Sequence, residues 1–251
     1  MQGWSRISRI YCRLKRARVL WLPFVLAVGR FYAAHAQSLT VLPVTIELAP
    51  GQSTTALTVI NQTDSETSFQ VRAYAWRQQN GSDQLDPTDD LLASPPLGTI
   101  LAKATQVVRL VLRRAPQGQE ATYRILLDQI PPPASPGTVR IALRLSIPVF
   151  AEPATRVAPH VQWRIETDGR QASLVAVNDG NRHEAVRNIE LGDGRALKVE
   201  ANVSPYILGG ATRRWRLVAP GAPPARGATM RLTAQGTSGT IDQPVSVVAV
   251  P

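Results

Sequence analysis

The chain has 251 residues and a formal net charge of +10, so it has room for two domains of roughly 100 residues each or for one large β domain. Its single cysteine excludes a disulfide scaffold. The basic balance would suit a nucleic-acid or membrane-surface protein, but its distribution along the sequence argues against both.

Residues 1–36 have the pattern of a secretory signal peptide. Six basic residues and no acidic one precede the apolar core VLWLPFVLAVG, and AHAQ offers a cleavage site after Ala36. The core has about 11 residues, whereas a bilayer span needs about 20. Arg30 interrupts the end of this core, so an uncleaved anchor stays open as an alternative.

Cleavage after Ala36 removes seven basic residues and no acidic one, which lowers the formal net charge from +10 to +3. Cys12 leaves with the same segment, so the mature chain has neither a disulfide nor thiol chemistry. We therefore expect a periplasmic protein with no nucleic-acid partner and no membrane span after cleavage.

Short strands separated by turns are predicted from residue 38 onward. Pro50-Gly51 and Asn80-Gly81 mark two of the turns. The Asp-rich segment 83–96 does not fit a calcium loop and is expected to be a polar loop that leads into a short strand. The other predicted strands up to residue 130 are 38–48, 54–61, 68–78, 99–114 and 121–130. This spacing indicates a sandwich of antiparallel sheets.

The segment VRIALRLSIPVF, residues 139–150, alternates apolar and other residues, which predicts a strand with one dry face. Its in-phase apolar residues are Val139, Ile141, Leu143, Leu145, Ile147 and Val149. An ordinary core strand of a closed sandwich is one interpretation. The length of the segment, Pro148, and the outward charges of Arg140 and Arg144 favour an edge strand that pairs with another protein.

The strand rhythm restarts after residue 155, and Pro153 and Pro159 suit a stiff linker. Removing the signal peptide leaves an N-terminal domain at 37–152 and a C-terminal domain at 153–251, each long enough for one β sandwich.

No catalytic, metal-binding or cofactor-binding group can be nominated, so the chain is not expected to be an enzyme. His160 and His183 have no partner cluster in the sequence and are expected at the surface or in turns. Trp215 is expected in the core. The arginines expected at a solvated strand end beside it are Arg213, Arg214 and Arg216.

The order of these segments resembles the periplasmic chaperones of the chaperone-usher pilus pathway. The segments that carry the likeness are PVTIELAPGQ, ALTVIN, FQVRAYAW, LLASPP, YRILLDQIPPP, VRIALRLSIPVF, VNDGNRHEAVRNIEL and YILGGATRRWRL. They cover nearly the whole mature chain. The resemblance implies an all-β protein of two immunoglobulin-like β-sandwich domains in an L-shaped arrangement.

The resemblance also implies a function. Chaperones of this family lend the last strand of their first domain to a pilus subunit that lacks its own final strand, and pass the subunit to an outer-membrane usher. The donor residues implied here are Val139, Ile141, Leu143 and Leu145. An uncovered donor strand also implies capping by a second copy. The alternative is an exported two-domain immunoglobulin-like binding protein or fibre component.

One departure from the family concerns the subunit's terminal carboxylate. The best-known members hold it between an arginine in the first strand and a lysine late in the donor strand, where this chain has Thr45 and Pro148. Arg124 in the neighbouring strand is the first candidate to replace this pair, and Arg109 is the second.

A second departure concerns the domain junction. Family members often have an acidic residue before the IPP turn and a basic residue after the donor strand, where this chain has Gln129 and Glu152. The contact between the domains is therefore expected to differ.

Overall fold

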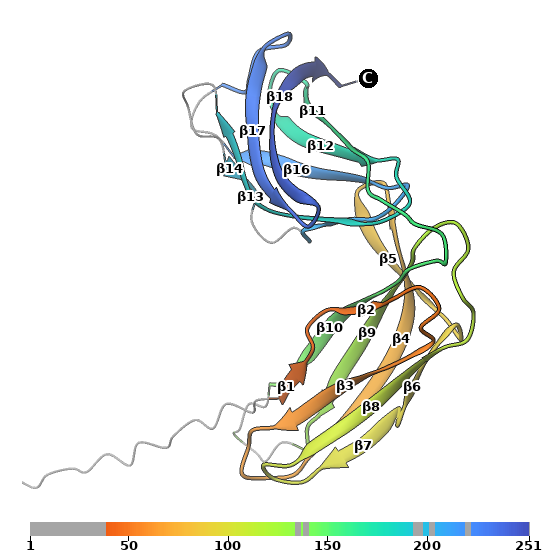
Figure 1. The fold of residues 1–251 in the computed structure, drawn as a ribbon. Coiled ribbons are helices and arrows are strands. Elements are labelled where there is room, and N and C mark those ends of the chain that lie inside the picture. Colours follow the sequence, from red (N-terminus) through yellow and green to blue (C-terminus); the bar gives the residue numbers. More distant parts are fainter. Residues whose placement is uncertain are drawn as a thin grey trace, which may run out of the picture. The chain divides into compact units, whose positions relative to one another are not determined.

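The structure is a computed structural model, which describes residues 39–133, 137, 141–192, 198–200, 204–218 and 222–250. These residues form strands, turns and irregular segments, and none of them is helical. The strands make two β sandwiches, which are called here the N-terminal and the C-terminal sandwich (Figure 1). The prediction of an all-β protein with two sandwich domains is confirmed.

The N-terminal sandwich contains ten strands in two sheets. They are β1 (Leu39–Leu42), β2 (Ile46–Leu48), β3 (Thr54–Asn61), β4 (Thr67–Gln79), β5 (Ser82–Pro87), β6 (Leu91–Ser94), β7 (Leu97–Ile100), β8 (Thr105–Leu112), β9 (Ala121–Ile130) and β10 (Arg144–Ala151). One sheet has the order β1-β3-β8-β6. The other has the order β2-β10-β9-β4-β5, and β7 also pairs with β4.

Alternation along the strands builds the N-terminal core. In β8, for example, Val108, Leu110 and Leu112 are buried, while Arg109 and Val111 between them are exposed. Successive side chains of a strand point to opposite faces of the sheet, so each sheet contributes every second residue to one shared core.

The predicted strands at 54–61 and 121–130 match β3 and β9 to the residue. The predicted strand at 38–48 is instead two strands, because β1 pairs with β3 in one sheet and β2 pairs with β10 in the other. The chain crosses between the sheets at Pro43, which has no N–H to continue the first ladder.

Two further predictions differ from the structure. The predicted strand at 99–114 is interrupted between β7 and β8 by a turn in which Lys103 has a φ of 57°. The loop prediction for the Asp-rich segment is wrong over Ser82–Pro87, which is β5. A hairpin turn in which Asn80 and Gly81 have φ of 53° and 79° aligns β5 with β4, despite the low strand propensity of β5.

The C-terminal sandwich contains eight strands around a second core. They are β11 (Val161–Thr167), β12 (Ala172–Asn178), β13 (Glu184–Gly192), β14 (Lys198–Val199), β15 (Tyr206–Ile207), β16 (Thr212–Val218), β17 (Thr229–Gly236) and β18 (Gly239–Ala249). Their order is β14-β16-β12-β11-β18-β17-β13-β15. Trp215 is buried in this core as predicted, and its ring stacks on Trp163 at a centroid distance of 5.8 Å.

Glu166 gives the C-terminal sandwich a pH-dependent contribution to stability. Its carboxylate is buried and accepts hydrogen bonds from Arg164, at 2.8 Å, and from Arg214. Burial opposes ionisation, but the two guanidinium groups outweigh it and hold the pKa of Glu166 below its usual value. The resulting stabilisation is present above the ordinary glutamate pKa of about 4.3 and is lost as the pH falls toward the lower pKa of the folded state.

We therefore expect Glu166→Gln to lower the free energy of unfolding by about 1.5–3 kcal/mol at neutral pH, because two charge-assisted hydrogen bonds are weakened. The variant should lose less stability than the wild type between about pH 5 and about pH 3. Urea unfolding curves at both pH values measure this difference. Parallel pH dependence in the two proteins would contradict it.

Candidate functional site

Strand β10 has a neighbouring strand on both sides at its Ala151 end, but on only one side at its Arg144 end. It pairs with β9 along its whole length, from Arg144 to Ala151, but β2 pairs only with Val149–Ala151 (Figure 1). Among the described residues no strand pairs with the other edge of β10 from Arg144 to Pro148. This half of β10 is therefore an open sheet edge.

The direction of the backbone groups follows from the ladder with β9. The N–H of Gln129 donates to the carbonyl of Leu143 at 2.9 Å. Pairs in an antiparallel ladder alternate, so Leu143 and Leu145 direct their backbone groups toward β9, while Arg144 and Ser146 direct theirs toward the open edge. Another chain could add a strand there.

Burial of the apolar face of β10 falls steadily toward its beginning. Val149 and Ile147 are buried in the core, Leu145 and Leu143 pack against it while partly exposed, and Ile141 is 81% exposed. Three of the four predicted donor residues thus extend from the core to the solvent along one face, and Val139 lies outside the described residues. The predicted strand at 139–150 is also shorter in the structure, because β10 begins only at Arg144.

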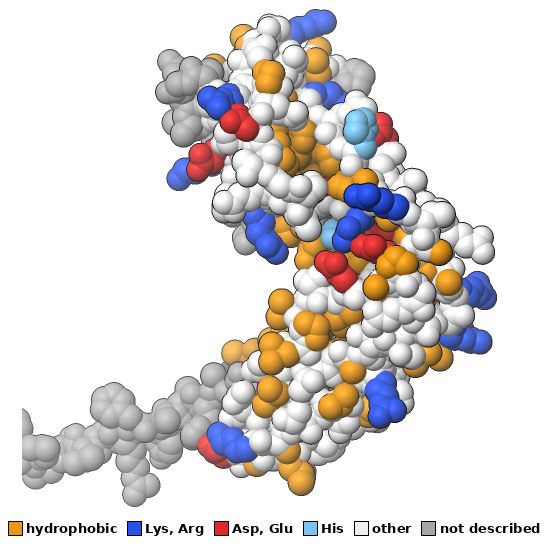
Figure 2. All heavy atoms as spheres, viewed as in Figure 1, with side chains coloured by type: hydrophobic (Ala, Val, Ile, Leu, Met, Phe, Trp, Pro, Cys, Tyr) orange, Lys and Arg blue, Asp and Glu red, His pale blue; other side chains and the backbone are white. Residues whose placement is uncertain are grey.

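Further apolar side chains accompany this open edge. Leu42 at the end of β1 and Val44 before β2 are 52% and 72% exposed, at the crossing where the chain leaves one sheet and joins the other. Figure 2 shows hydrophobic side chains gathered on the N-terminal sandwich where β1, β2 and β10 lie. Exposed apolar surface beside unpaired backbone favours binding of a protein segment rather than a small molecule.

Arg124 lies on the other face of the same sheet. Its neighbours in the strand register are Pro148 on β10 and Tyr74 on β4. The guanidinium carbon of Arg124 is 3.7 Å from the ring centroid of Trp76, which is a close cation–π contact, and 5.6 Å from that of Tyr206.

The positions Thr45 and Pro148, where the family's usual anchoring pair is missing, both lie near Arg124. The hydroxyls of Thr45 and Tyr206 are 3.4 Å apart, and Tyr206 is within cation–π reach of Arg124. Arg124, the first candidate for the carboxylate anchor, thus lies close to the two positions where the family's usual anchoring pair is missing.

Arg124 is a partly buried cation that forms no ion pair with the acidic residues of the described part of the chain. Burial lowers the pKa of its guanidinium from the usual value, and the Asp83 carboxylate opposes that shift. A guanidinium nevertheless stays protonated in proteins. No acidic residue in the described part of the chain forms an ion pair with Arg124, so its cation is available to an incoming carboxylate.

Arg109 is not brought to this site. It is an exposed residue of β8, where it is paired with Ala56 on β3 and Ser94 on β6 in the other sheet. The core separates that sheet from β10, so Arg109 lies away from the open edge.

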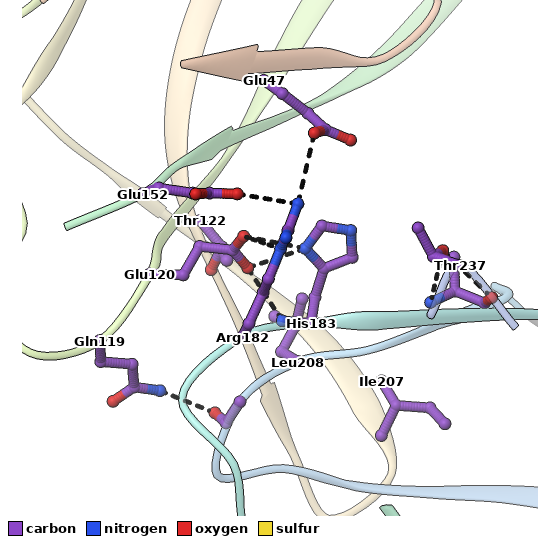
Figure 3. Close-up of polar contacts among 12 residues, drawn as sticks. Glu47, Gln119, Glu120, Thr122, Glu152, Arg182, His183, Ile207, Leu208 and Thr237 are labelled. Carbon is purple, nitrogen blue, oxygen red and sulfur yellow. Dashed lines mark hydrogen bonds and ion pairs between the residues drawn. The ribbon is translucent and has the colours of Figure 1, made fainter. Parts of the chain in front are cut away.

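A buried polar cluster joins the two sandwiches (Figure 3). The carboxylate of Glu120, just before β9, accepts hydrogen bonds from the backbone N–H of His183 at 3.0 Å and contacts its ring Nδ1 at 2.8 Å. The His183 ring stacks on Phe150 of β10 at a centroid distance of 3.5 Å. His183 lies in the connection between β12 and β13, in line with the expected turn position, but it is buried and not at the surface, because the other sandwich covers it. His160 is exposed, as predicted.

Arg182 extends this cluster at its rim. Its guanidinium forms ion pairs with Glu152 at 2.8 Å and with Glu47 at 3.4 Å, and its Nε lies 3.8 Å from Glu120 (Figure 3). Glu152, which stands where the family often has a basic residue, thus takes part in the contact between the sandwiches as an acidic partner of Arg182.

The β4–β5 hairpin makes the other half of the junction. The side-chain amide of Gln78 donates to the carbonyl of Tyr206 at 2.9 Å and accepts from the N–H of Leu208 at 3.0 Å. Arg213 is buried and pairs with Asp83 at 3.1 Å, so its expected position at a solvated strand end is wrong, whereas Arg214 and Arg216 are exposed. An apolar cluster fills the space between these contacts: Trp76, Phe150, Ala185, Tyr206, Leu208 and Ala211.

Other kinds of site find no support among the described residues. No group of three or more His, Cys, Asp or Glu side chains in that part of the chain is arranged to hold a metal ion. The same residues include no helix that is long and apolar enough to cross a membrane.

Comparison with known proteins agrees with this geometry. Residues 38–156 match the family model of the pili and flagellar-assembly chaperones, PapD N-terminal domain. A sequence search among curated proteins finds no significant match.

Several solved structures share the fold. A chain of the CsuC–CsuE chaperone–tip adhesion subunit pre-assembly complex, from the archaic chaperone-usher Csu pili of Acinetobacter baumannii, is 20% identical over 85% of this chain and 100% of that one, with a TM-score of 0.61. A chain of the complex of SafA pilin with the SafB chaperone from Salmonella enterica is 16% identical over 85% of this chain and 97% of that one, with a TM-score of 0.58. The Pseudomonas aeruginosa CupB2 chaperone is 14% identical over 83% of this chain and 100% of that one, with a TM-score of 0.56.

The family match covers the sandwich that contains the open half of β10, and the structural likeness extends over both sandwiches. Residues 38–156 therefore match the N-terminal domain of the pili and flagellar-assembly chaperones, and both sandwiches share the fold of chaperones of solved structure.

Proposed function

We propose that this protein is a periplasmic chaperone that binds pilus subunits by donor-strand complementation, with β10 and the residues before it as the donor. The observation that carries the proposal is the open edge of β10, where Leu145 and Leu143 are partly exposed and Ile141, just before the strand, is 81% exposed. A subunit that lacks its last strand would gain both a backbone ladder and the missing apolar side chains.

The energy available from this face is sufficient for a stable complex. Burying four aliphatic side chains, Val139 included, would supply about 6–12 kcal/mol at about 1.5–3 kcal/mol each. Association consumes part of that in lost freedom of motion, and the added backbone hydrogen bonds offset some of the loss. The proposal therefore requires no nucleotide or other cofactor.

The proposal also covers the bound partner, the export of the chaperone and the delivery of the subunit. Two structural neighbours are complexes of a chaperone with a tip adhesion subunit and with a pilin, which supports a subunit as the partner here. Residues 1–36 would direct export to the periplasm, and the loaded chaperone would deliver its subunit to an outer-membrane usher. Before loading, a second copy could cap the open edge.

Co-purification tests the proposal. Tagged protein comprising residues 37–251 is expressed in the periplasm with its exported subunits, and the bound proteins are identified by mass spectrometry. We expect a small exported subunit that protects residues 141–147 from amide exchange. A bound subunit that protects another surface, or no subunit despite its expression, would contradict the proposal.

We also propose Arg124 as the residue that anchors the subunit's terminal carboxylate. Arg124→Met keeps an unbranched side chain over Trp76 but removes the charge. A hydrogen-bonded ion pair of this kind contributes about 1.5–3 kcal/mol, so affinity for the subunit should fall roughly 10–100-fold. Calorimetric titration of purified wild-type and variant proteins with the subunit measures the change.

A peptide of the subunit's C-terminal segment, made with a free carboxylate and with a terminal amide, isolates the charge effect. The Arg124→Met variant should weaken binding of the carboxylate form alone. Arg109→Met is the matched control and should bind both forms like the wild type, because Arg109 lies in the other sheet. An equal loss for the two peptide forms would exclude Arg124 as the carboxylate anchor.

A further inference from the structure

The beginning of β10 keeps an extended, paired conformation although only one neighbouring strand supports it. Residues 144–148 have β9 on one side and no strand on the other among the described residues. A strand end with one ladder and partly exposed side chains is expected to open easily. Two side chains of β9 act against that opening.

Gln129 holds the backbone of Leu143, the residue just before β10. Its N–H donates to the carbonyl of Leu143 at 2.9 Å, and its side-chain carbonyl accepts the N–H of Leu143 at 3.4 Å. Gln129 is itself buried, so its side chain is fixed in place. One residue thus contacts both backbone groups of Leu143, and its side chain continues the ladder beyond the last regular pair.

Asp128 holds the next residue through its side chain. It lies directly opposite Arg144 in the register, and its carboxylate accepts a hydrogen bond from that guanidinium and another, at 2.6 Å, from Arg72 of β4. Burial opposes ionisation of Asp128, but the hydrogen bonds from Arg144 and Arg72 outweigh it and keep its pKa below the usual value. The ion pair therefore ties β10 across β9 to β4.

We infer that Gln129 and Asp128 are positioning residues that hold the donor segment, residues 143–146, in its paired conformation before a subunit arrives. This inference rests on the proposed function, because it names what prepares the same edge for binding. An edge that is already extended loses less conformational freedom on association, so preorganisation raises affinity without adding a contact to the subunit. Neither residue needs to touch the partner.

The test compares two arginines that share one carboxylate. Arg144→Gln removes the ion pair that links β10 to Asp128 of β9. Arg72→Gln removes the other ion pair of Asp128 and leaves the Arg144–Asp128 pair intact. Amide exchange by NMR is measured in the free protein, residue by residue. We expect exchange at Leu143 and Leu145 to rise about tenfold in Arg144→Gln and to change less than twofold in Arg72→Gln, with matched thermal midpoints.

Subunit binding completes the test. The association rate should fall roughly fivefold in Arg144→Gln and in Gln129→Ala and stay near the wild-type value in Arg72→Gln. Unchanged exchange at Leu143 and Leu145 in Arg144→Gln would overturn the inference, as would faster exchange with an unchanged association rate. If the wild-type protein binds no subunit, the proposed function fails instead, while the exchange measurement still decides whether Asp128 holds the strand.

Discussion

Replacing Glu120 by alanine should lower the free energy of unfolding by about 2–6 kcal/mol, because it leaves two buried N–H donors of His183 without an acceptor, at about 1–3 kcal/mol each. Glu120 and His183 side chains are each only 2% exposed, and the carboxylate is the acceptor for both the backbone N–H and the ring Nδ1 of His183. Urea unfolding followed by tryptophan fluorescence measures the loss, since Trp76 lies in the same junction.

Glu47→Ala is the matched control. Its carboxylate also faces Arg182 at the junction, but at 3.4 Å and with half of its side chain exposed. Exposed ion pairs contribute about 0–1 kcal/mol, so this variant should unfold close to the wild type. If the two alanine variants lost the same stability, the Glu120–His183 pair would not be the contact that fastens the sandwiches together.

This junction also matters for the donor strand. Phe150, on which His183 stacks, belongs to β10. The C-terminal sandwich therefore packs against the end of the strand whose other end, at Arg144, has an open edge. The strand is therefore anchored at its far end by burial and by the second sandwich, and at its near end only by β9. This asymmetry leaves the open edge at residues 144–146 accessible without releasing the strand from the fold.

Local patterning was enough to predict most of the N-terminal sandwich. Apolar alternation located β3 and β9 to the residue, and the Asn80-Gly81 turn signal was correct. The arm after that turn, Ser82–Pro87, was missed because its residues have low strand propensity and only pairing with β4 makes it a strand. Sequence reports what a segment prefers by itself, and tertiary pairing can override that preference.

In the candidate site, too, some features follow from local sequence and others depend on tertiary pairing. Arg124 and Arg109 both lie on alternating strands, and the sequence alone ranks them only by nearness to the donor strand. What separates them is the sheet in which each strand sits, because β8 crosses to the opposite sheet while β9 pairs with β10. His183 was misplaced for a related reason, since its partner Glu120 is 63 residues away and belongs to the other sandwich.

Leu143→Asp should weaken subunit binding at least about 100-fold while leaving the chaperone folded. The loss combines the missing burial of an aliphatic side chain, about 1.5–3 kcal/mol, with the cost of placing a carboxylate in the subunit's apolar groove. Together these exceed the roughly 3 kcal/mol that corresponds to 100-fold in affinity. Leu143 is only partly buried in the free protein, so its replacement should cost the fold far less than it costs the complex.

Leu97→Asp is the matched control, because Leu97 is 59% exposed on β7, which pairs with β4 and not with β10. Calorimetric titration of both variants with one purified subunit, beside their thermal midpoints, separates binding from folding. Equal affinities in the two variants would mean that the subunit does not occupy the apolar face of the donor segment, and the open edge of β10 would then need another partner. A selective loss in Leu143→Asp would place the subunit's apolar groove on that face.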